Sequence, residues 1–96
     1  MLQQVEIIGQ IYSEATSKVG SNGKEFMSFK VVVHEGSDEK RKDYYYNVLA
    51  DRTAVMEHLT KDKKVFVSGK LTPSVSIKDD HAYLNLNVFA RNITLI

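Results

Sequence analysis

The sequence predicts an all-β fold, a small closed barrel of five strands in Greek-key order with one short helix between the third and fourth strands. Five segments alternate between apolar and polar residues with the period of a β-strand, and only one segment has the spacing of a helix. This order of elements is typical of the OB fold, in which a helix closes one end of the barrel. A chain of 96 residues supplies one hydrophobic core, so we expect residues 1–96 to form a single domain.

The first strand is predicted from Gln4 to Thr16, which is long for a strand. Glycine inside a strand marks a bend, so Gly9 is where we expect this strand to turn and serve both halves of the barrel. A hairpin turn is predicted at Gly20–Gly23, because its Asn22-Gly23 pair accepts positive φ angles at low cost. On the strand itself, four residues share one face: Val5, Ile7, Gly9 and Ile11.

The second and third strands are predicted to form the next hairpin. Lys24–His34 alternates cleanly between apolar and polar residues, and Glu35–Asp43 is polar or glycine throughout, as expected of a solvated loop. The third strand is predicted from Tyr44 to Ala50.

A short helix is predicted from Arg52 to Thr60, with Asp51 as its N-cap. Val55, Met56 and Leu59 would give this helix a narrow apolar stripe facing the barrel.

The fourth strand is predicted from Val65 to Leu71, followed after Pro73 by a short extended arm and the turn Lys78–His81. The fifth strand is predicted from Ala82 to Ile93. Four of its residues are expected to face inward: Leu84, Leu86, Val88 and Ala90.

Composition excludes several classes of protein. The chain has no cysteine, so it has no disulfide, thiolate metal site or cysteine nucleophile. No apolar run approaches the roughly 18 residues that a membrane span needs, and the first residues lack the features of a signal peptide. We therefore expect a cytoplasmic protein without a membrane partner. The net charge of +1 argues neither for nor against nucleic acid, because charges can be segregated on the surface.

Catalysis has little support in the sequence. His34, His58 and His81 fall on a strand end, the helix and a turn, without the spacing of metal ligands. The run Asp79-Asp80-His81 is typical of a polar turn. We expect no enzyme, no metal and no cofactor.

Binding of single-stranded nucleic acid has a better physical basis. The alternation of the third strand places Tyr44 and Tyr46 on the core side and Tyr45 on the outer face, where an unpaired base can stack on its ring. Phosphates between bases need cations nearby. The candidate cations lie on the second strand, the polar loop, the fourth strand and the arm after it: Lys24, Lys30, Arg41, Lys42, Lys70 and Lys78.

Over nearly its whole length the chain resembles the bacterial single-stranded DNA-binding proteins. The resemblance depends on Val5–Gly9, on Phe29–Val33 before a polar loop, on Tyr45 with Val48-Leu49-Ala50, and on Lys64–Leu71. It implies an OB fold, binding of single-stranded DNA in replication, repair or recombination, no cofactor, and assembly into homodimers or homotetramers. The strand-three aromatic that stacks bases in this family corresponds to Tyr45.

The chain departs from that family in two respects. Other stacking positions, aromatic in the family, fall on Ser37, Asp51 and Ser76, and the flexible tail with an acidic tip that recruits partner enzymes is missing. The resemblance implies single-stranded DNA and replication proteins as partners, but the segment that recruits such proteins is missing. A second hypothesis is an adaptor similar to a primosomal replication protein, which would act through protein contacts or self-assembly.

Overall fold

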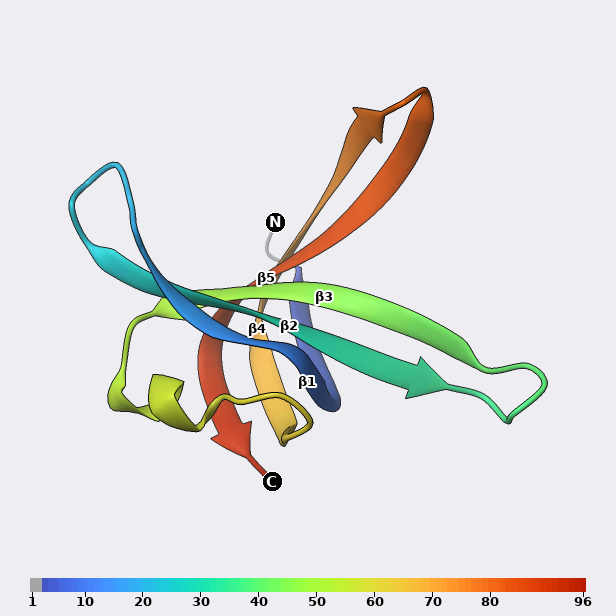
Figure 1. The fold of residues 1–96 in the computed structure, drawn as a ribbon, viewed down its shortest axis with the longest axis horizontal. Coiled ribbons are helices and arrows are strands. Elements are labelled where there is room, and N and C mark those ends of the chain that lie inside the picture. The colour runs from blue at the N-terminus through green and yellow to red at the C-terminus, as the bar shows by residue number, and fades with distance from the viewer. Residues whose placement is uncertain (1–2) are drawn as a thin grey trace.

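The computed structural model describes residues 3–96, which form a closed barrel of five strands in the order β1-β2-β3-β5-β4 (Figure 1). The predicted OB-type architecture is confirmed. The strands and the one short 3-10 helix, η1, follow in chain order: β1 (Gln4–Val19), β2 (Glu25–Glu35), β3 (Lys42–Asp51), η1 (Ala54–His58), β4 (Lys64–Lys78) and β5 (His81–Leu95). Among these residues no helix is long and apolar enough to cross a membrane.

Strand β1 closes the barrel by pairing with two different strands. Residues 4–10 pair with β4, and residues 10–19 pair with β2, so that Gln10 faces both Val32 and Lys64. Gly9 lies at this change of partner, and a Cβ atom there would collide with the backbone carbonyl of Val32 and the side chain of Val31. The close approach that bends β1 therefore requires glycine at this position, as the sequence predicted.

The core is built by the two-residue alternation of all five strands. Five inward-facing residues of β1 and β2 are at most 6% exposed, and on the other three strands four residues are fully buried: Val48, Val65, Val67 and Val88. Leu59 seals one end of the barrel, since its side chain is fully buried and its carbonyl accepts a hydrogen bond from Ala15 N at 3.1 Å. Burying a leucine contributes about 1.5–3 kcal/mol.

The predicted helix from Arg52 to Thr60 is wrong in extent and type. Asp51 ends β3 instead of capping a helix, and the segment forms only η1, whose N-cap Thr53 makes no side-chain cap hydrogen bond. So few residues do not repay the cost of nucleating an α-helix, and the tighter 3-10 turn is the usual outcome in short connections. The apolar stripe still works, because Val55 and Met56 pack against the core.

The predicted extended arm after Pro73 is in fact part of β4. Strand β4 pairs continuously with β5 out to Lys78↔His81, and the hairpin projects well beyond the barrel (Figure 1). Within residues 3–96, the pairing of β4 with β1 ends at Gln4↔Lys70, and the N–H of Leu71 donates to Gln3 O just beyond it. The nitrogen of Pro73 lies on the same edge of β4, so its missing N–H removes no hydrogen bond among the described residues. The prediction that Leu84 faces the core is wrong, since this side chain is 66% exposed on the projecting hairpin.

Strands β1, β2 and β3 also extend beyond their predicted limits. The loop between β2 and β3 shrinks accordingly, because His34, Glu35, Lys42 and Asp43 pair across the hairpin. Tyr44 keeps its core-side parity, but its ring is 37% exposed because this part of the hairpin reaches past the barrel.

Candidate nucleic-acid interface

The outer faces of β2, β3, β5 and β4 form one continuous surface. Pairing across β2 and β3 joins Lys30 to Asn47, and pairing across β3 and β5 joins Asn47 to Asn87 and Leu49 to Phe89. Side chains that face each other across paired strands point to the same side of the sheet. We call this surface the outer sheet face.

Two tyrosine rings lie together on this face. Tyr45 is 53% exposed and Tyr12 of β1 is 40% exposed, and their ring centroids lie 5.2 Å apart at 67°, an edge-to-face contact. An edge-to-face contact restrains the orientation of both rings and is slightly stabilising. Tyr45 therefore offers a held, accessible ring to a base. The contact of Tyr12 with Tyr45 was not predicted from the sequence, because it depends on the pairing of β1 with β2.

Two of the predicted cations share this face with Tyr45. Lys30 lies on β2 two residues before Val32, which pairs with Tyr45, so the Lys30 and Tyr45 side chains point to the same side. Lys70 lies on β4 and pairs with Phe89. Both lysines are exposed and neither forms a salt bridge within residues 3–96. They lie on the two outer strands of this surface, β2 and β4.

The other predicted cations are dispersed over three hairpin ends. Lys24 lies in the β1–β2 turn, Arg41 and Lys42 at the β2–β3 end, and Lys78 at the tip of the β4–β5 hairpin. The alternation of β3 directs Lys42 to the side opposite Tyr45. The structure thus places Tyr45, Lys30 and Lys70 on one face of the sheet, and it leaves these four at the periphery.

Arg41 is engaged by an acidic neighbour. Its Nε donates to Asp43 Oδ1 at 2.9 Å, and His34 Nδ1 lies 2.6 Å from the same oxygen. The hydrogen bonds from Arg41 and then from His34 lower the pKa of Asp43, and the same contact with Asp43 raises the pKa of Arg41. A phosphate would have to compete with Asp43 for this guanidinium.

Uncharged polar side chains link the three strands at the base of the projecting hairpin. Asn47 Nδ2 donates to Asn87 Oδ1 at 3.2 Å, and Asn87 Nδ2 donates to the carbonyl of Thr72 at 3.1 Å and to Ser74 Oγ at 3.2 Å. This ladder ties β3 to β5 and β4 where the hairpin leaves the barrel. It supplies further hydrogen-bonding groups on the outer sheet face.

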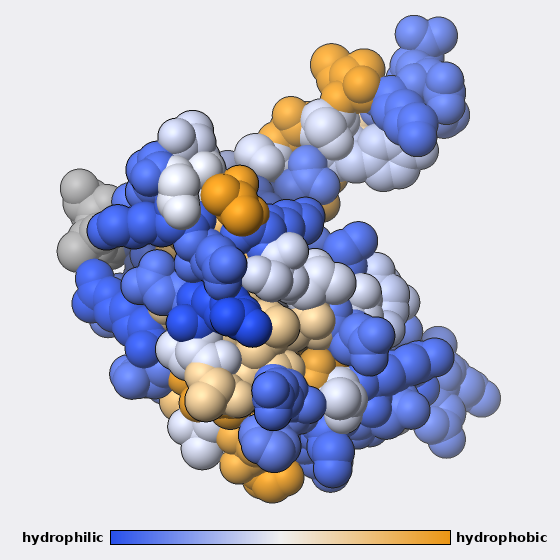
Figure 2. Space-filling view, turned by 60° about the vertical axis from the view of Figure 1, so that its left-hand side comes forward, coloured by the Kyte–Doolittle hydropathy of each residue, from blue (hydrophilic) through white to orange (hydrophobic). Residues whose placement is uncertain are grey.

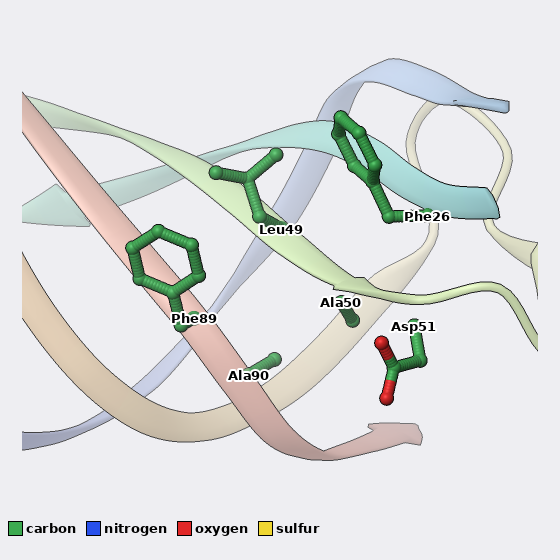
Figure 3. Close-up of a pocket in the computed structure, with 6 residues that line it drawn as sticks. All are labelled: Phe26, Leu49, Ala50, Asp51, Phe89 and Ala90. Atoms are coloured by element: carbon green, nitrogen blue, oxygen red, sulfur yellow. The ribbon is translucent and has the colours of Figure 1, made fainter. Parts of the chain in front are cut away.

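An apolar hollow of about 370 Å³ lies beside this ladder (Figure 3). Phe26 and Phe89 lie on either side of Leu49, and the Asp51 carboxylate lies at one edge. Phe89 is 50% exposed. That Phe89 points outward follows from its place next to buried Val88. Its proximity to Phe26 could not be predicted from the sequence, because it depends on the parallel pairing of β3 with β5.

No candidate metal site is found in the part of the chain that the structure describes. Within residues 3–96, no group of three or more histidine, cysteine, aspartate or glutamate side chains is arranged to hold a metal ion. His34 is paired with Asp43, while His58 and His81 lie on η1 and at the start of β5.

Comparison with solved structures shows the same fold in single-stranded DNA-binding proteins. A small single-stranded DNA-binding protein from Streptomyces coelicolor superposes with a TM-score of 0.80 at 15% identity, over 100% of this chain and 95% of that one. Two crystal structures of the mitochondrial single-stranded DNA-binding protein of S. cerevisiae give a TM-score of 0.73 each, at 20% and 18% identity, over 100% of this chain and 96% and 95% of theirs. No family model and no curated protein sequence matches the chain.

Proposed function

We propose that this protein is a non-catalytic, sequence-tolerant binder of single-stranded DNA. The observation that carries the proposal is the exposed Tyr45 ring, held by Tyr12 on a sheet face that also bears Lys30 and Lys70. The fold shared with single-stranded DNA-binding proteins from two organisms supports it.

The chemistry requires no reacting group. A base stacked on the Tyr45 ring contributes about 1–3 kcal/mol irrespective of its identity, since every base has a π face. Lys30 and Lys70 would neutralise phosphates on either side and release counterions. A protein that coats unpaired DNA in this way serves replication, repair or recombination, and homodimers or homotetramers would join several such faces.

Titration of the protein with fluorescently labelled oligo-dT at low and moderate salt tests the proposal. Tyr45→Ala should raise Kd about 5-fold or more, because it removes one stacking ring. Tyr44→Ala is the matched control, since it removes the same side chain from the opposite side of β3 and should leave Kd nearly unchanged. An unmodified protein that does not bind oligo-dT even at low salt would refute the proposal.

A second candidate function is an adaptor that acts through protein contacts or self-assembly. Exposed apolar side chains on one side of the projecting hairpin favour it, with Val75 and Leu84 each 66% exposed and Ile77 79% exposed (Figure 2). This candidate predicts oligomers that form without DNA and bind it weakly. Light scattering combined with the same titration separates the two functions.

A further inference from the structure

The apolar hollow beside Leu49 has no part in the function proposed above, although it lies on the same outer sheet face as Tyr45. Phe26 pairs with Asp51 across β2 and β3, and Leu49 pairs with Phe89 across β3 and β5, so all four side chains point outward. Leu49 is four residues from Tyr45 along β3, about 13 Å at the rise of a strand. A DNA strand that crosses Tyr45 is thus within reach of the hollow.

The lining of the hollow suits the flat face of a nucleobase. The Phe26 and Phe89 rings lie on either side of Leu49 and give the hollow an aromatic and apolar surface (Figure 3). Its volume of about 370 Å³ lies within the range of small-ligand sites. Unpaired bases are commonly held by such stacking together with hydrogen bonds to their Watson–Crick edge.

Asp51 gives this site a chemical preference. Its carboxylate is exposed, forms no salt bridge within residues 3–96, and accepts hydrogen bonds but donates none. Guanine presents two adjacent donors, N1–H and the N2 amine, which match the two oxygens of a carboxylate. Cytosine and adenine present one amine beside an acceptor nitrogen. Thymine presents a single N–H between two carbonyl oxygens, both of which a carboxylate repels.

We infer that the hollow lined by Phe26, Leu49, Phe89 and Asp51 is a nucleobase site that selects bases with an exocyclic amine, guanine above all, over thymine. The inference rests on the proposed function and adds a base preference to it. The same protein then binds any single strand through Tyr45 and the lysines, and binds it more tightly where a guanine reaches the hollow.

Fluorescence anisotropy with three oligonucleotides tests the inference: oligo-dT, the same oligomer with one central dG, and the same oligomer with one central deoxyinosine. Deoxyinosine keeps N1–H but lacks the N2 amine. The unmodified protein should bind the dG oligomer about 5-fold or more tightly than oligo-dT, with deoxyinosine between them, because a bidentate pair discriminates at this level. Asp51→Asn should reduce the ratio of the affinity for the dG oligomer to that for oligo-dT to about one.

Glu57→Gln is the matched control, because Glu57 is exposed on η1, does not line the hollow, and loses the same charge. It should keep the dG-to-dT ratio, and circular dichroism should show both variants folded. Equal binding of all three oligomers by the unmodified protein would overturn the base preference and leave the proposed function standing. Failure to bind any oligomer would overturn the proposed function and this inference with it.

Discussion

Tyr45 shows how a single residue acquires its accessibility from the period of its strand. Tyr44 and Tyr46 take the core side of β3, and Tyr46 packs against the core, while Tyr45 remains on the outer face against Tyr12. The sequence predicted this placement because alternation within one strand is local. It did not predict the contribution of Tyr12, Phe26 or Phe89, because which strands lie side by side is decided by the whole barrel.

Removal of Tyr12 should weaken DNA binding indirectly. Without its edge-to-face contact, the Tyr45 ring gains rotational freedom that a stacked base must restrict again. Tyr12→Ala should therefore raise Kd for oligo-dT less than Tyr45→Ala does, and the double variant should resemble Tyr45→Ala alone. Titrations of the two single variants and the double variant measure this coupling; additive effects would mean that each ring acts independently.

Asp43 should restrain Arg41 from binding phosphate. Asp43→Asn removes the carboxylate that holds the guanidinium, so affinity for oligo-dT at low salt should rise about 2- to 5-fold, the scale of one exposed ion pair. Asp38→Asn makes the same charge change in the neighbouring loop between β2 and β3 without touching this pair. An equal gain in both variants would show that net charge alone is responsible.

The pH dependence of this cluster has a definite sign. The pKa of Asp43 is lowered below its ordinary 3.8, chiefly by the hydrogen bond from Arg41 and next by His34. The contribution of the cluster to stability is therefore complete above about pH 3.8 and is lost as pH falls through the depressed value. Carboxyl carbon NMR of Asp43 should show a midpoint below 3.8; a higher midpoint would contradict the ion-pair geometry.

At the scale of elements, the strands were predictable and their connections were less so. Alternation identified all five strands and their order, because apolar residues at period two are seldom found outside a strand. The helix was overestimated, since spacing alone does not reveal whether a short segment can nucleate. The length of β4 was underestimated at Pro73, because sequence does not show which edge of a strand is free.

Gly69 marks a close approach of two strands. It lies at the irregular step in the pairing of β4 with β5, and a Cβ there would collide with Phe89 O and Ala90 Cα, both backbone atoms that cannot move aside. Gly69→Ala should lower the free energy of unfolding by about 1–3 kcal/mol, as in overpacked cores. Urea denaturation measures it, with Thr72→Ala on the same strand as the control; equal stability of Gly69→Ala and the unmodified protein would contradict the crowding.

At the scale of the whole molecule, a net charge of +1 leaves binding to depend on where the cations lie. The logarithm of the binding constant should fall linearly with the logarithm of salt concentration, by about 0.7 for each phosphate neutralised on a single strand. Lys30→Ala and Lys70→Ala should each lessen that slope by about 0.7. Lys61→Ala, in the turn after η1, should leave the slope unchanged. If none of the three substitutions alters the slope, the DNA binds elsewhere on the protein.

The position of β5 between β3 and β4 also bears on how the protein matures during synthesis. Without β5, the pairings that remain give an open antiparallel sheet, β4-β1-β2-β3, with two unpaired edges. Pairing of β5 with both edges closes the sheet and brings Val88 into the interior. Until β5 has paired, residues that later line the barrel interior remain accessible to chaperones and proteases.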